Sequence, residues 1–156
     1  MDPKQFQFDE RTILSILLIV LAFLLGRQIP RWMAGVPYLK PDAARDLLAN
    51  EPDTIVLDVR MPTQFTGKDG HIKDAINLPL IDLMGRMKQI APELAQYAHS
   101  PVLLVCKNDQ LSSRAARLLR KGGLNRVAVL SGGLKAWKKA GMPVEVAEAP
   151  AQAKQG

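Results

Sequence analysis

Cysteine is almost absent from this sequence, and its scarcity excludes several kinds of site. Cys106 is the only cysteine in 156 residues, so the chain can form neither an internal disulfide nor a zinc site built from several cysteines. A lone thiol suits a reducing compartment. Three interpretations of Cys106 stay open at this point: a small buried residue, a metal ligand or a nucleophile.

Aromatic residues are also scarce, and acidic residues are nearly missing from one long stretch. Residues 107–139 hold nine Lys and Arg but a single acid, Asp109, in a chain of net charge +6. Such a stretch is either a solvated helical face or a surface for a small anion, an anionic lipid or an acidic protein. No nucleic acid partner is expected, because aromatics are few and no nucleic-acid-binding motif is present.

Charge is absent from residues 12–26, which read TILSILLIVLAFLLG and lie between Arg11 and Arg27. Eleven of these fifteen residues are Leu, Ile, Val or Phe, which favours insertion into a bilayer. As a helix the run is roughly 22 Å long, shorter than a ~30 Å hydrocarbon core, but the two arginines extend its reach. We predict a transmembrane helix at 12–27 rather than a buried core helix or a cleaved signal peptide.

The flanking charges predict the orientation of this helix. Four Lys and Arg lie within residues 27–45, whereas two precede the run, so the C-terminal part is expected in the cytoplasm. The chain then reads as a single-pass protein of a bacterial inner membrane. Its predicted parts are a short N-terminal segment (1–11), the helix, a juxtamembrane linker (28–35) that begins because Pro30 ends the helix, a globular domain (36–146) and a disordered tail (147–156).

Short apolar runs alternate with helical segments across the predicted domain. PVLLV and VAVL are apolar throughout, TIVLDV is apolar except for Thr54 and Asp58, and two shorter runs stand at 38–39 and 75–78. Helical patterns separate them at 41–50, 80–97, 113–121 and 134–140. Strands that are apolar on both faces and alternate with helices predict an α/β domain whose parallel sheet is covered on both sides.

Cys106 directly follows the predicted strand PVLLV, and Asp58 lies at the end of TIVLDV. Ligands of open parallel sheets bind beyond the carboxyl ends of the strands, so both residues are expected at the functional edge. The loop after Cys106 leads into a helix, whose free N–H groups would favour a thiolate, as would Lys107. Position alone leaves a packed structural cysteine equally open.

Three segments together resemble the single-domain rhodanese family of sulfurtransferases: VLDVRMPTQFTGKDGHIKDAINLPL, CKNDQLS and LSGGLKAWKKAGMPVE. Their shared marks are Asp-Val-Arg at 58–60, Gly-His-Ile and Ala-x-Asn within 70–77, and Gly-Gly-x-x-x-Trp at 132–137. The resemblance implies a rhodanese-like three-layer fold, with a five-stranded parallel sheet and helices on both faces. It also implies persulfide chemistry at Cys106, for which no metal or cofactor is expected.

The resemblance assigns roles to several residues. Cys106 is the nucleophile, Asp58 and Arg60 support the loop, and His71 is structural. Ser112 stands where phosphatase relatives of the fold carry an arginine, so the loop lacks the group that would clamp a phosphate. The outer sulfur would be bound by the loop, which consists of Lys107, Asn108, Asp109, Gln110, Leu111 and Ser112.

Two loop positions depart from the family pattern. Asp109 stands where glycine is usual, and Leu111 where Arg, Thr or Ser is usual. A carboxylate there is expected to repel a dianionic donor such as thiosulfate. The sequence therefore predicts a membrane-anchored sulfurtransferase that takes sulfur from a small donor or a protein persulfide and passes it to a thiol or other nucleophile. The alternative is a catalytically weak or inactive module that tethers a membrane or protein partner.

Overall fold

Five parallel strands form one sheet, in the order β1-β5-β4-β2-β3. The computed structural model describes residues 9–108 and 110–146. Asp109, the first eight residues and the predicted tail at 147–156 therefore lie outside the described residues. The strand bounds are Tyr38–Leu39 (β1), Ile55–Asp58 (β2), Ile76–Asn77 (β3), Val102–Val105 (β4) and Val127–Leu130 (β5). The sheet confirms the predicted five-stranded α/β fold.

β4 lies in the middle of the sheet and is buried on both faces. It pairs with β2 from Ile55↔Val102 to Asp58↔Val105 and with β5 on its other side. Successive side chains of a strand point to opposite faces. Val102 and Leu104 accordingly belong to one core cluster and Leu103 and Val105 to the other, which explains why PVLLV is apolar throughout.

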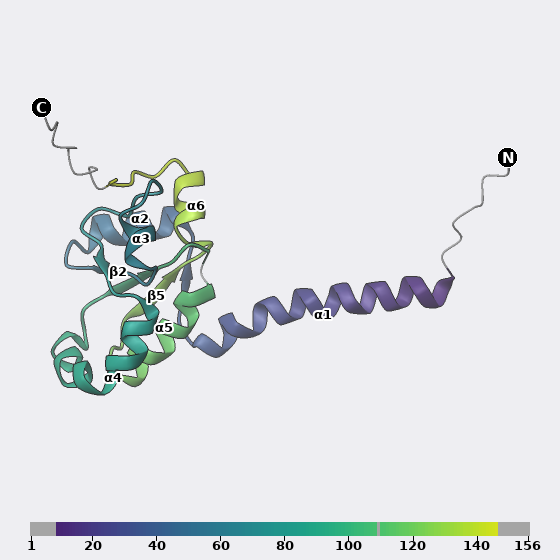
Figure 1. Ribbon diagram of the computed structural model, residues 1–156, viewed down its shortest axis with the longest axis horizontal. Coiled ribbons are helices and arrows are strands. Elements are labelled where there is room, and N and C mark those ends of the chain that lie inside the picture. The colour runs from purple at the N-terminus through teal and green to yellow at the C-terminus, as the bar shows by residue number, and fades with distance from the viewer. Residues whose placement is uncertain (1–8, 109, 147–156) are drawn as a thin grey trace, which may run out of the picture.

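Helices cover both faces of the sheet (Figure 1). On one side, Leu83 of α4 (Leu80–Leu94) and Leu119 of α5 (Gln110–Lys121) pack into the first cluster. On the other, Ala44 of α2 (Pro41–Asn50) and Trp137 of α6 (Gly133–Lys139) pack into the second. The two remaining short helices are α3 (Pro62–Phe65) and the 3₁₀ turn η1 (Ala95–Tyr97).

Two helices differ from the sequence prediction inside the domain. α5 begins at Gln110, three residues before the predicted start at Ser113. The predicted start was too late because the first turn of the helix is polar and gives no apolar periodicity. α3 was not predicted, since four residues are too few to show a helical period. The earlier start of α5 brings the N-terminus of this helix closer to Cys106 along the chain.

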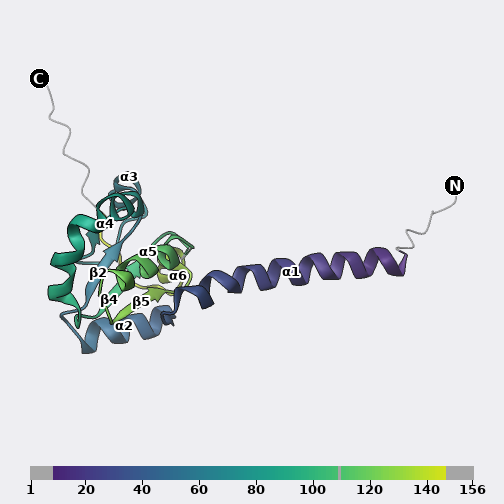
Figure 2. The same ribbon diagram turned by 90° about the horizontal axis from the view of Figure 1, so that it is seen from below.

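α1 (Glu10–Ala34) is one long helix that runs away from the sheet in both views (Figures 1 and 2). Within the described residues, no helix is both long and apolar enough to span a bilayer, so the transmembrane helix predicted at 12–27 is not supported. The physical reason is that the charge-free run between Arg11 and Arg27 is only fifteen residues long. The helix also continues through Pro30 to Ala34, so the prediction that Pro30 ends it and starts a linker at 28–35 is wrong.

Candidate active site

Cys106 lies at the carboxyl edge of the sheet, directly after β4, and its side chain is fully buried. Asp58, the last residue of β2, pairs in register with Val105 and is also fully buried. The structure thus places both predicted residues at the same edge. Cys106 packs into the core cluster that includes Leu104 and Ala115, so its thiol lies at the base of the loop that follows it.

The first turn of α6 contacts the backbone of this loop. The Cys106 carbonyl accepts a hydrogen bond of 2.8 Å from the Leu134 N–H, and the Lys107 carbonyl accepts one of 3.2 Å from the Lys135 N–H. Gly133 has φ +59°, and a Cβ there would overlap the Cys106 carbonyl and approach the Asn108 nitrogen to 2.7 Å. Only glycine fits this position, which gives the Gly-Gly pair of the sequence a physical role.

The side chains of the loop differ in their exposure to solvent. Lys107, Asn108, Gln110 and Leu111 are exposed, and Asp109 lies outside the described residues. α5 starts within the loop at Gln110. The first N–H groups of a helix have no partner inside the helix and carry partial positive charge. They therefore favour an anion beside Cys106.

Among the described side chains of the loop, Ser112 alone is fully buried. Among the described residues, its hydroxyl has no hydrogen-bond partner. Leaving a buried hydroxyl unpaired costs about 1–3 kcal/mol, so such a group is expected to meet a ligand. Its position six residues after Cys106 makes an atom bound within the loop the natural candidate.

Asp58 and Arg60 form a buried ion pair that supports the loop's edge of the sheet. The Asp58 carboxylate accepts from the Arg60 guanidinium at 2.6 and 2.9 Å and from the Arg60 backbone N–H at 3.0 Å. Arg60 also donates to the carbonyls of Gln64 at 3.2 Å and Gly70 at 2.8 Å. Each nitrogen of the guanidinium thus donates to a protein group, an arrangement that suits a supporting role.

Asn77 has a structural role that the sequence did not reveal. Its amide donates to the carbonyls of Asp58 at 3.0 Å and Arg60 at 2.8 Å, and it thereby joins β3 to the chain leaving β2. The Ala-x-Asn pattern drew attention to Asn77, but it did not indicate which groups Asn77 binds. His71 is likewise structural, since its ring stacks on Phe65 and its Nδ1 lies 3.1 Å from the Phe65 carbonyl.

Three cations of the basic stretch at 107–139 bind partners in different parts of the chain. Arg120 donates to the Gly35 carbonyl and Arg126 pairs with Glu51, whereas Lys138 pairs with Asp69.

In the described part of the chain, no three His, Cys, Asp or Glu residues gather as metal ligands would.

Sequence comparison with known proteins identifies a family for this chain. A family model described as a rhodanese-like domain matches residues 40–140. The chain is 34% identical over 122 residues to the uncharacterized protein YqhL of Bacillus subtilis, covering 78% of this chain and 90% of that protein. It is 31% identical over 101 residues to a sulfurtransferase of Allochromatium vinosum, covering 65% of this chain and 87% of that protein.

Solved structures agree with the sequence comparisons. The rhodanese-like domain of the Alr3790 protein from Anabaena aligns with a TM-score of 0.59 and 31% identity, covering 77% of this chain and 89% of that one. The range matched by the family model, 40–140, includes β2 to β5 and the loop after Cys106.

Gly133 offers a direct test of the loop geometry. We expect Gly133→Ala to lower the free energy of unfolding by about 1–3 kcal/mol more than Gly141→Ala does, because it adds overlap with the loop to the strain of a positive φ. Gly141 is the matched control, since its φ is +75° and a Cβ there would meet nothing within 4 Å. Urea unfolding of the full chain measures both. Equal losses would show that Gly133 does not confine the loop.

Proposed function

Since this chain belongs to the rhodanese-like domain family, we propose that it is a sulfurtransferase that carries a sulfane sulfur on Cys106 as a persulfide. The observation that carries the proposal is the setting of Cys106, a buried thiol at the end of a central parallel strand, in a loop that leads within four residues to the start of α5. The first N–H groups of a helix stabilise negative charge, and the thiolate is the nucleophilic form of cysteine.

The proposed reaction has two balanced steps. The Cys106 thiolate attacks the sulfane sulfur of a donor, a new S–S bond forms, and the donor's bond to that sulfur breaks with its electron pair leaving on the donor. An acceptor thiolate then attacks the outer sulfur of the persulfide. The bond to Cys106 breaks, and its electron pair restores the Cys106 thiolate. No external oxidant or reductant is needed.

The residues around Cys106 have distinct proposed roles. Backbone N–H groups of residues 107–112 hold the outer sulfur, and the unpartnered hydroxyl of Ser112 donates a further hydrogen bond to the bound group. Lys107 supplies a positive charge at the mouth of the loop. The exposed side chain of Leu111 offers an apolar rim for the body of a larger donor or a protein persulfide.

Persulfide formation is the first test of this proposal. Intact-mass measurement of the full chain after incubation with sulfane-sulfur donors is expected to show a gain of one sulfur atom with at least one donor. Cys106→Ser is expected to show none, because the nucleophile is lost. If correctly folded wild-type protein gains no sulfur from any donor, the chain is better described as a tethering module.

Asp109 is proposed to select against anionic donors. At an effective dielectric of about 20 and a separation of roughly 6 Å, a unit charge pair is worth ~3 kcal/mol before screening. Solvent and salt reduce this to about 1 kcal/mol, on the order of tenfold in rate.

Substitution of Asp109 tests that selection. Asp109→Asn and Asp109→Gly are expected to raise the rate of loading from thiosulfate while leaving a neutral donor nearly unchanged. Asn keeps tolerance for the left-handed conformation and so separates charge from backbone freedom. Efficient thiosulfate use by the wild type, unaltered by either substitution, would contradict the idea.

A location at the inner membrane, with the domain in the cytoplasm, remains a proposal. It is supported by α1, whose large apolar side chains between residues 13 and 25 are 47–68% exposed. Exposed apolar area of this size is costly in water, and contact with lipid would remove that cost.

Cell fractionation tests the location. Wild-type protein is expected in the membrane fraction, and the pair Leu18→Glu and Leu21→Glu is expected to move it toward the soluble fraction. Ile81→Glu, at a similarly exposed position on α4, is the matched control. In spheroplasts, added protease should spare the domain until the cells are lysed. Soluble wild-type protein, or cleavage before lysis, would contradict the proposal.

A further inference from the structure

A cavity of about 520 Å³ opens beside the Cys106 loop, and lysine dominates its charged lining. Lys68 comes from the segment after α3, Lys107 from the loop itself, and Lys135 and Lys138 from α6. Asp69 is the only acid among the lining residues. Segments far apart in the sequence thus bring four positive charges around one cavity.

The positive charge of this cavity exceeds its negative charge. The Lys138 ammonium donates to the Asp69 carboxylate at 2.8 Å. That hydrogen bond and the charge of Lys138 lower the pKa of Asp69, and the charges of Lys68 and Lys107 lower it further. The Asp69 carboxylate therefore interacts with several lysines at once. In the described part of the chain, Lys68, Lys107 and Lys135 have no ion-pair partner.

The other cation in the lining does not change this balance. Arg60 is buried and its charge is matched by Asp58 at 2.6 Å. The four lysines and Asp69 leave three unbalanced positive charges. Positive charge concentrated in a cleft raises the local concentration of anions. The expected ligand therefore carries more than one negative charge.

The cavity is coupled to the loop of Cys106 through the backbone. Lys107 is the residue next to Cys106, and the N–H groups of Leu134 and Lys135, both in the lining, donate to the carbonyls of Cys106 and Lys107. A ligand held by the lysines would lie beside the loop. The volume falls in the range of small-molecule sites, about 300–1,000 Å³, and exceeds what a donor as small as thiosulfate requires.

We propose that this cavity binds the sulfur acceptor, a low-molecular-weight thiol that bears at least two anionic groups, and presents its thiol to the sulfur carried by Cys106. The inference rests on the proposed function and names its acceptor class. The acceptor thiol loses its proton to solvent, and its thiolate forms a bond to the outer sulfur. The Cys106–sulfur bond breaks, and the electron pair stays on Cys106.

Binding can be tested without the reaction. Full-length Cys106→Ser protein is titrated by calorimetry with S-methylglutathione, which carries carboxylates, with S-methyl-coenzyme A, which carries phosphates, and with the diethyl ester of S-methylglutathione. At least one anionic probe is expected to bind, and the ester about tenfold more weakly than its parent acid. The two anionic probes distinguish carboxylate from phosphate ligands. No binding by either probe overturns the proposal, as does equal binding of acid and ester.

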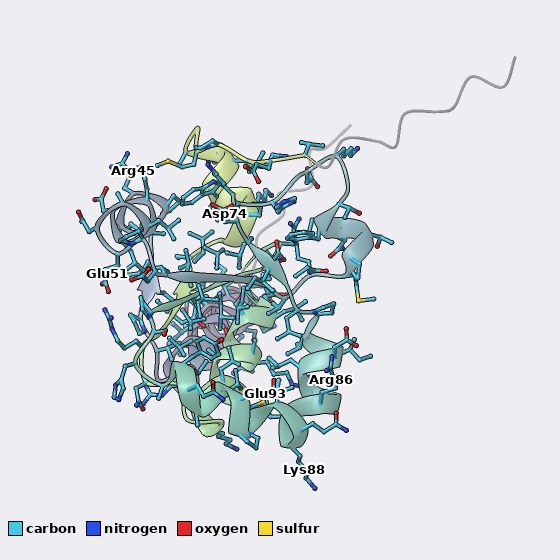
Figure 3. All side chains as sticks on the ribbon, turned by 90° about the vertical axis from the view of Figure 1, so that its left-hand side faces the viewer. Arg45, Glu51, Asp74, Arg86, Lys88 and Glu93 are labelled. Atoms are coloured by element: carbon cyan, nitrogen blue, oxygen red, sulfur yellow. The ribbon has the colours of Figure 1, made fainter. Side chains whose placement is uncertain are left out.

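Substitution of the lysines locates the binding. Lys135→Gln, added to the same protein, is expected to weaken the anionic probe about three- to fivefold. Lys88→Gln removes an equal charge from α4, where the side chain projects away from the domain on the side opposite α6 (Figure 3), and is expected to change nothing. Equal effects of the two substitutions would show that only net charge matters and would overturn the site.

A single-turnover experiment tests the acceptor role. Persulfide-loaded wild-type protein is mixed with glutathione or with uncharged 2-mercaptoethanol, and loss of the sulfur mass is followed. The ratio of the two rates is expected to fall about tenfold in the Lys68→Gln, Lys135→Gln double variant, and to stay constant in Lys88→Gln. If the protein loads sulfur but the ratio does not move, this inference fails alone. If it never loads sulfur, the proposed function fails, and calorimetry still decides the cavity.

Discussion

The buried ion pair between Asp58 and Arg60 holds together the edge of the sheet on which the site is built. Neither charge could remain there alone, because losing one partner of such a pair costs about 3–5 kcal/mol. The pair also organises its surroundings, since Arg60 donates to the carbonyls of Gln64 and Gly70, and Asn77 donates to the carbonyls of both pair members. These contacts fix the end of β2, the short helix α3 and β3 relative to β4, the neighbouring strand that ends just before Cys106.

The sequence predicted those features that depend on neighbouring residues. β4 is recognisable because a central parallel strand is apolar on both faces, and Cys106 and Asp58 meet at one edge because each follows or ends such a strand. Features that join distant segments left no local signal. The contacts of Asn77 span 17 and 19 residues, and the pair that closes the lysine cavity, Lys138 with Asp69, spans 69.

The positions of the charged side chains in the folded chain were also not predictable from the local sequence. Residues 107–139 look uniformly basic in sequence, but the cations of α5, of α6 and of the segment before β5 bind different parts of the molecule. Arg126 reaches Glu51 at the opposite end of the sheet, and Lys138 reaches Asp69 beside α3. Only the lysines near the loop share a cavity with Lys107. The helix α1 illustrates a local failure instead, because a single proline removed one backbone donor without ending the helix.

The complete burial of Cys106 has a consequence for the proposed persulfide. In a persulfide the transferable sulfur lies one S–S bond, about 2.05 Å, beyond the cysteine sulfur. In the proposed carrier, the outer sulfur would thus lie farther from the core than the buried Cys106 sulfur. Oxidation of cysteine to sulfinic and sulfonic acids follows exposure of the thiolate. Burial of Cys106 therefore limits its irreversible oxidation, which would protect the thiol of the proposed carrier while no sulfur is bound.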